Sequence, residues 1–198
     1  MTRSFSKNVK EIFYKSKTKK ILEKIDSLRN ANNKESKKII CSCLNDLSKM
    51  KYQNCLNLKN CILENAVLKN IQLSRVCFWN ADLKGVDFSN AVLPEADFWN
   101  ANLFQANLEN TTLTDATFTH SNLQWANLKN ADLRRAKLEE SNLEGADFSG
   151  ANLKWAKIEL HQLKSVRSLT KTTMPDGTIF SAGWAKIIET TPLPNSKN

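Results

Sequence analysis

Large apolar residues recur at every fifth position along most of the chain. From Leu58 to Ile158 there are 21 consecutive central positions of this kind, occupied by 15 leucines, 5 phenylalanines and 1 isoleucine, without a slip in register. The residue two before each central position is alanine in 13 cases, and the residue immediately before it is asparagine or aspartate in 12. Most of the sequence is therefore a strict five-residue repeat.

This period fits neither regular secondary structure. Five residues advance an α-helix by about 500°, so the central residues would spiral around its surface. In a flat strand, an odd period would place alternate central residues on opposite faces. The pattern fits a chain that turns a corner every five residues, so that four pentapeptides form one square coil and successive coils stack at roughly 4.8 Å. Large central residues would then alternate with small residues inside a narrow tube.

Residues 20 positions apart should stack in columns along such a tube. Phe78, Phe98 and Phe118 share an inward column, and Trp79 and Trp99 are neighbours in an outward column. A further column predicts a ladder of side-chain amide hydrogen bonds, and it contains Asn70, Asn90, Asn110 and Asn130.

Several pentapeptides share one short motif, A(N/D)LXX. Clean copies are ADLKG (81–85), ANLFQ (101–105), ANLEN (106–110), ANLKN (126–130), ADLRR (131–135) and ADFSG (146–150). On these residues the chain resembles the pentapeptide-repeat family over residues 56–160. The resemblance implies an all-β solenoid, a right-handed quadrilateral β-helix, here of about five coils in residues 54–163.

Different segments are expected at the two ends of the solenoid. Residues 1–53 are interpreted as a basic α-helical extension or cap. It contains two helices joined around NANNKE, and the second helix is expected to cover the first coil as a lid. Residues 164–198 leave the five-residue period and are interpreted as a C-terminal cap followed by a disordered tail. His161, at an inward slot where the repeat fails, is interpreted as a core histidine rather than a ligand.

Charge is concentrated at the N-terminal end. The chain has a formal net charge of +9, and residues 1–53 contain 14 Lys+Arg against 5 Asp+Glu, whereas residues 54–198 contain 15 of each. The five cysteines lack a CxxC pair and are read as reduced thiols of a cytoplasmic protein. The N-terminus lacks the apolar core of a secretory signal, although its basic, serine-containing character leaves an organelle transit peptide open.

The sequence contains no constellation typical of catalysis. There is no glycine-rich phosphate loop, no HExxH, no GxSxG and no usefully spaced cysteine–histidine pair. A solenoid with a filled core also offers no substrate cavity. We therefore expect no enzyme activity, no cofactor, no metal and no small-molecule substrate.

Two sets of surface residues are candidates for contacting a partner. Trp79, Trp99 and Phe104 form a candidate protein-binding patch, although the same side chains can instead cover neighbouring apolar stems. In the basic N-terminal segment, candidate contacts to an anionic partner are Lys15, Lys17, Lys19 and Lys20. This segment can also be merely the soluble face of a cap, or dock an acidic protein. Trp125 and Trp155 are interpreted as structural corners, and Arg134 and Arg135 as a solvated pair.

Three functions are compatible with these features. The first is a non-enzymatic scaffold whose flat walls bind a partner protein. The resemblance implies the second, because some pentapeptide-repeat proteins mimic B-form DNA and bind DNA gyrase or topoisomerase IV. Such mimics use an acidic wall, whereas residues 56–160 carry 10 Lys+Arg and 13 Asp+Glu. The third is a factor that associates with an anionic membrane or with nucleic acid through the basic N-terminal helices.

Overall fold

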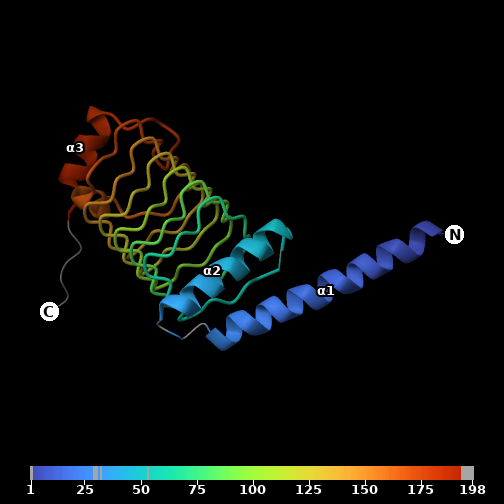
Figure 1. Cartoon of the computed structure of the whole chain (residues 1–198). Helices are drawn as coiled ribbons and strands as arrows, with labels where there is room; N and C mark the ends of the chain where they lie inside the picture. Colours follow the sequence, from blue (N-terminus) through green and yellow to red (C-terminus); the bar gives the residue numbers. More distant parts are fainter. Residues whose placement is uncertain (1, 29–30, 32, 53, 193–198) are drawn as a thin grey trace.

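The structure is a computed structural model that describes residues 2–28, 31, 33–52 and 54–192, with side chains from Lys15 onward. Its elements are α1 (Thr2–Leu28), α2 (Lys34–Lys49), a 3₁₀ helix η1 (Leu160–Ser165) and α3 (Ala182–Thr190). Between α2 and η1 the chain winds into a solenoid, with α2 at one end and α3 at the other (Figure 1).

Each coil of the solenoid pairs with the next one at an offset of 20 residues. Parallel bridges join Asn57 to Cys77, Cys77 to Asp97 and Asp97 to Thr117, and the same offset holds on the other three sides. These are isolated bridges rather than long strands, because each side has room for only a few extended residues between two corners. The predicted square coil of four pentapeptides is therefore present.

Every corner is a tight turn with one residue in the left-handed region. In the turn that begins at Leu58, the N–H of Cys61 donates to the Leu58 carbonyl at 3.2 Å, and Asn60 has φ +58°. A positive φ at the third residue of a turn, with a negative φ before it, is typical of a type II turn, which favours Gly or Asn at that place. This conformational preference explains why asparagine recurs at this slot.

All five backbone N–H groups of a pentapeptide are satisfied by this arrangement, as residues 96–100 illustrate. Ala96 donates to the turn, Asp97 to the preceding coil, and Phe98 and Asn100 to the following coil. Among the described residues, the N–H of Trp99 has no backbone partner, and it donates to the Asp97 side chain at 3.0 Å. An asparagine or aspartate before the central position therefore supplies an acceptor for this remaining N–H.

This fifth bond recurs wherever asparagine or aspartate precedes the central residue. In all twelve cases, the side-chain oxygen accepts the N–H two residues later, at 3.0–3.3 Å. The (N/D) of the motif thus completes the hydrogen bonding of the turn, a role that the sequence pattern alone did not reveal.

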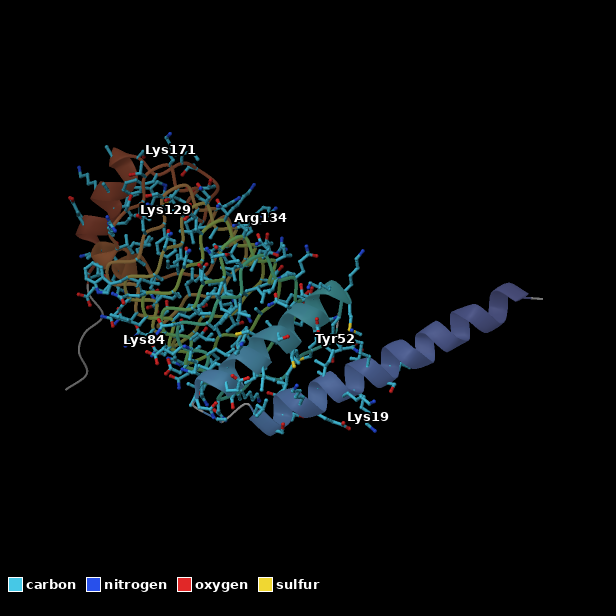
Figure 2. The ribbon with its side chains drawn as sticks, in the orientation of Figure 1. Lys19, Tyr52, Lys84, Lys129, Arg134 and Lys171 are labelled. Carbon is cyan, nitrogen blue, oxygen red and sulfur yellow. The ribbon has the colours of Figure 1, made fainter. Side chains whose placement is uncertain are left out.

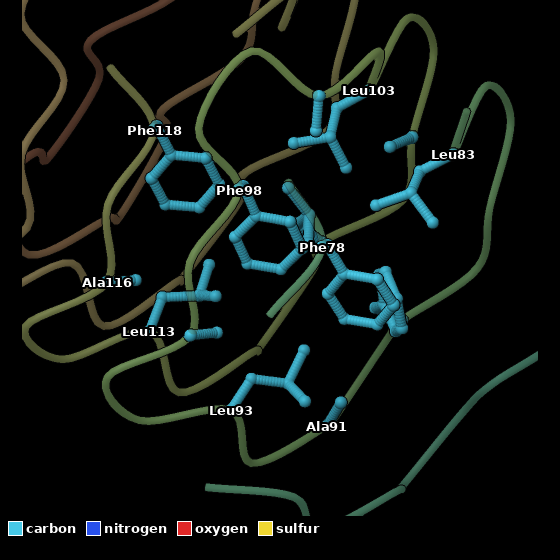
Figure 3. Packing of buried hydrophobic residues seen from close by; sticks show 14 of the residues in the cluster. Phe78, Leu83, Ala91, Leu93, Phe98, Leu103, Leu113, Ala116 and Phe118 are labelled. Carbon is cyan, nitrogen blue, oxygen red and sulfur yellow. The ribbon is translucent and has the colours of Figure 1, made fainter. Parts of the chain in front are cut away.

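Central and small residues are buried inside the tube. Phe98 lies between Phe78 and Phe118, with ring centroids 5.2 and 4.9 Å away and nearly parallel planes (Figure 3). All three rings are fully buried. Leu93 and Leu103, on the sides before and after Phe98, are also fully buried. The expected phenylalanine column is present.

Amide ladders run along the outside. The predicted asparagine column shows one such bond, from Asn130 to Asn110 at 3.2 Å. Longer ladders lie at the slot before the central residue, where Asn107 donates to Asp87 at 3.2 Å and Asn127 donates to Asn107 at 3.1 Å.

The two N-terminal helices meet the first coil through apolar side chains of α2. Ile40, Leu44 and Leu47 are fully buried in the same cluster as the solenoid core. Near the end of α2, the Ser48 hydroxyl accepts the backbone N–H of Gln72 at 2.7 Å. That N–H faces outward from the first coil, where no preceding coil can accept it. α1 packs against α2 and then continues past it, away from the solenoid (Figure 1).

At the opposite end, the coil extends beyond the point where the sequence pattern ends. Ser168 bridges Asp147, and Thr173 bridges Asn152, so the offset is 21 rather than 20 residues. Leu169 and Met174 are buried at central positions. η1 accommodates the additional residue and interrupts the five-residue period. The last turns therefore cannot be recognised in the sequence by a repeat of exactly five residues.

The interruption also changes which side chain closes the core. His161, expected to be a core residue, is half-buried, and its Nε2 lies 3.6 Å from a carboxylate oxygen of Glu159. Gln162 is buried instead, and its amide donates to the carbonyls of Leu138 and Ser141 at 2.9 and 2.7 Å. The side-chain amide thereby satisfies backbone acceptors at the end of the tube.

Candidate partner-binding surfaces

Trp79 and Trp99 form a continuous aromatic stripe on one wall of the solenoid. Each follows a central phenylalanine, so both occupy the first outward slot on adjacent coils. Their ring centroids are 4.9 Å apart with an interplanar angle of 48°. Both side chains are half-buried, which leaves part of each indole accessible. The sequence prediction that these tryptophans stack is confirmed.

Charged and polar groups extend the stripe in both directions. The Lys59 ammonium lies 4.2 Å from the Trp79 ring centroid, a cation–π distance. On the other side, the imidazole of His120 meets Trp99 edge-on with centroids 5.7 Å apart, and its Nδ1 lies 3.3 Å from a Glu140 carboxylate oxygen. We call Lys59, Trp79, Trp99 and His120 the tryptophan stripe. The indole N–H of Trp79 is buried without a hydrogen-bond partner among the described residues.

Phe104 lies on the next wall, apart from the tryptophan stripe. It is half-buried, and its described neighbour is the Lys84 ammonium, 6.0 Å from the ring centroid. In the described part of the chain, no ring contact joins Phe104 to Trp79 or Trp99. The structure therefore brings the two tryptophans together but leaves Phe104 separate from them.

Trp125 and Trp155 are more exposed than the tryptophan stripe. Their side chains are 53% and 57% exposed, because each occupies the left-handed corner of its turn, with φ +60° and +62°. The Trp125 ring lies over Gly145 of the next coil, where a Cβ would come within 2.5 Å of it. The interpretation as structural corners is right about the backbone position, but the sequence did not reveal how much indole surface this position exposes.

Several carboxylates on the walls form ion pairs with arginine or lysine. The Arg134 guanidinium binds Asp132 through two bonds at 2.6 and 2.7 Å, and Arg135 binds Asp115 in the same way on the adjacent coil. The bonds from Arg135 hold the pKa of the Asp115 carboxyl below its usual value. The Lys129 ammonium lies 3.5 Å from an Asp147 carboxylate oxygen. The walls thus have interspersed charge rather than an acidic surface.

The four candidate lysines of α1 do not share one face of the helix. Lys15, Lys17, Lys19 and Lys20 are all exposed. Lys19 lies 3.9 Å from Glu23 on the side turned away from α2 (Figure 2). Lys17 and Lys20 instead line a cleft between α1 and α2 together with Lys24. Lys24 was not among the candidate contacts predicted from the sequence. A helical projection would have separated these two groups, because their positions lie on opposite flanks of the buried stripe.

Cysteines and metal-binding residue types are dispersed. Cys41, Cys43, Cys55, Cys61 and Cys77 are free thiols. Burial raises the pKa of the Cys41, Cys43 and Cys77 thiols, which disfavours reactive thiolates. Among the described residues, no cluster of three or more His, Cys, Asp or Glu side chains could hold a metal ion. None of the described helices is both long and apolar enough to cross a bilayer.

Two family models match the sequence. The model for "Pentapeptide repeat region" matches residues 93–167, and the model for "Pentapeptide repeats (8 copies)" matches residues 55–90. Together they span more than half of the 198 residues. No curated protein matches the sequence.

Solved structures of repeat proteins are also similar to this chain. The protein Rfr23 from the cyanobacterium Cyanothece 51142 is 24% identical, with 66% of this chain and 97% of that chain covered and a TM-score of 0.30. A protein from the thylakoid lumen of Arabidopsis thaliana is 27% identical, with coverages of 46% and 63% and a TM-score of 0.23. QnrB1, a plasmid-mediated fluoroquinolone resistance protein, is 16% identical, with coverages of 68% and 88% and a TM-score of 0.23.

Proposed function

Because this chain belongs to the pentapeptide-repeat family, we propose that it is a non-enzymatic scaffold that presents the walls of its β-helix to a partner protein. The inward side chains form the core, so only the outward side chains of the coils can contact a partner. The family's right-handed quadrilateral form, here of about five coils, supplies flat walls. In this proposal α2 caps the first coil, and residues 164–192 close the other end.

The tryptophan stripe is the observation that carries the proposal. Two adjacent indoles are held in fixed positions by neighbouring coils, and a cation lies at one end and an imidazole at the other. Partly exposed tryptophans on a rigid support lose little conformational entropy when a partner covers them. A partner would also offer an acceptor for the indole N–H of Trp79 if docking opened access to it.

A pull-down from nuclease-treated lysate of the source organism tests the proposal. The bait is wild-type protein beside a Trp79→Ala/Trp99→Ala variant and a Trp125→Ala/Trp155→Ala variant as the matched control. We expect a partner that is retained by wild type and by the control, but lost with the first variant. Circular dichroism must show that all three baits are folded. Equal recovery with all three, or no specific partner of wild type, would contradict the proposal.

DNA mimicry, the competing function, has less support because several carboxylates of the walls are paired with lysine or arginine. Asp132 and Asp115 are held by arginines, and Asp87 lies 3.1 Å from the Lys69 ammonium. A mimic of the DNA phosphate backbone needs a wall of unpaired negative charge. A DNA gyrase supercoiling assay decides between the two functions, and inhibition at micromolar protein would favour mimicry over the scaffold.

A further inference from the structure

A cleft of about 270 Å³ lies along the seam between α1 and α2, away from the walls of the solenoid. Ile21 and Ile25 of α1 are buried against α2 and define the seam. Lys17, Lys20 and Lys24 lie together on one flank of these isoleucines, because positions three, four and seven apart share one face of a helix. The cleft is lined by Lys17, Lys20, Ile21, Lys24, Ile39, Ser42, Cys43 and Asp46.

The charge in this cleft is strongly unbalanced. Three lysines line it, against a single acidic residue, Asp46. Lys17, Lys20 and Lys24 make no ion pair within 4.0 Å in the part of the chain that the structure describes. Like charges three and four residues apart on a helix repel each other, so an anion between them would relieve this repulsion.

The other groups of the cleft do not oppose an anion. Burial raises the pKa of the Cys43 thiol, which therefore adds no negative charge near neutral pH. Ser42 presents a hydroxyl that can donate a hydrogen bond from the α2 side. Ile21 and Ile39 complete the lining with apolar side chains, which add no charge.

We propose that this cleft binds a phosphate group through Lys17, Lys20 and Lys24. The site goes beyond the scaffold function, because it lies on the helical extension and uses none of the residues of the tryptophan stripe. Flexible lysine ammoniums are suited to an anion approached as a point charge. A single phosphate or pyrophosphate fits the volume of the cleft. The phosphate can belong to a free anion or to a phospholipid headgroup, and the two sources are separable by experiment.

Two titrations of the full chain at low ionic strength test the site. Isothermal calorimetry with pyrophosphate probes the free anion. Co-sedimentation with phosphatidylcholine vesicles, with and without phosphatidic acid, probes the headgroup. Binding in the first titration alone assigns a free anion, and binding to phosphatidic acid vesicles alone assigns a headgroup. In either case we expect affinity to fall as salt is added, because the lysines are exposed.

Two variants with the same change in charge separate a site from diffuse attraction. Lys17→Gln/Lys20→Gln removes two ammoniums of the cleft, and Lys15→Gln/Lys19→Gln removes two from the opposite flank of the same helix. We expect at least a tenfold loss of affinity in the first variant and less than a twofold loss in the second. Thermal melts must show that both variants stay folded, as expected for exposed lysines.

Equal losses in the two variants would overturn the proposal, because the binding would then follow net charge rather than the cleft. Absence of binding by wild type to both pyrophosphate and phosphatidic acid vesicles would overturn it as well. Neither result bears on the tryptophan stripe, whose test uses variants at the other residues and a protein partner. Failure of the phosphate site and failure of the scaffold are therefore distinguishable.

Discussion

Truncating Phe98 should destabilise the solenoid more than removing any half-buried aromatic residue on its walls. Phe98 is fully buried and stacks on Phe78 and Phe118. Phenylalanine-to-alanine changes in packed cores cost about 3–5 kcal/mol, which includes the cavity that remains. Two stacked ring pairs are lost as well, and such pairs contribute up to about 1.5 kcal/mol each. We therefore expect Phe98→Ala to lower the free energy of unfolding by about 4 to 5 kcal/mol, the upper half of that range.

Equilibrium urea unfolding followed by circular dichroism measures this loss. Phe104→Ala is the matched control, because Phe104 is only half-buried on an outer wall, and about 1 kcal/mol is expected for it from the apolar area that it covers. Phe98→Leu should cost less than Phe98→Ala, since leucine fills most other central positions of the tube. The slope against urea should stay the same in all variants, so that the comparison reports stability alone.

A decrease in unfolding free energy below about 1 kcal/mol for Phe98→Ala would refute the reasoning, because removing a phenyl ring from a well-packed core costs several times more. A loss for Phe104→Ala as large as that for Phe98→Ala would have a different meaning. It would show that Phe104 is a structural residue, and it would remove Phe104 from the candidate partner-binding residues.

The remaining predictions concern the turns and the walls. Asn102→Ala should lower the free energy of unfolding by about 1 kcal/mol in the same urea assay, because it removes the acceptor of a turn N–H and two ladder bonds; an unchanged midpoint would contradict it. Gly145→Ala should be destabilising, because Gly145 has φ +68° and a Cβ there would clash with the Trp125 ring. Adding Trp125→Ala to this variant should restore part of the lost thermal stability. If the effects of the two substitutions are purely additive in thermal melts, the clash is not the cause. Hydrogen bonds from Arg135 lower the pKa of Asp115 in the folded protein. The ionised carboxylate therefore stabilises the fold above the ordinary carboxyl pKa of about 3.9, and this stabilisation is lost as pH falls through the lower pKa of the folded state. Asp115→Asn should flatten the acid side of a curve of unfolding free energy against pH, and an unchanged curve would contradict this.

The sequence predicted the solenoid because the repeat encodes the geometry directly. A period of five excludes a helix and a flat strand, and residues 20 apart, such as Phe78 and Phe98, do stack. The same logic failed near residue 160, where η1 inserts one residue into the coil. A strict register search stops there, although Leu169 and Met174 continue the core. A search that allowed one inserted residue would have found them.

The surface was harder to predict, because exposure depends on the conformation of each corner. Trp79 and Trp125 both occupy outward slots in the sequence. Trp79 packs against the indole of the next coil, whereas Trp125 sits at a left-handed corner and lies over a glycine. The lysine cleft was missed for another reason. Lys17, Lys20 and Lys24 share one flank of α1, but the cleft beside them exists only because α2 packs against α1 and supplies Ile39, Ser42 and Asp46.

The hydrogen bonding of the coil limits where this protein can vary its function. The small and central residues fill the tube, and in twelve of the repeats the residue before the centre accepts a turn N–H, as Asp97 does for Trp99. The corner residue must tolerate a positive φ, which favours asparagine or glycine. The first outward slot has none of these duties, and it is the slot that Trp79 and Trp99 occupy. Side chains at this slot are therefore the ones that can be exchanged to suit a partner while the coil stays intact. A binding surface on the walls should accordingly be sought there first, and a separate activity on the appended helices, where α1 and α2 are free of the repeat's constraints.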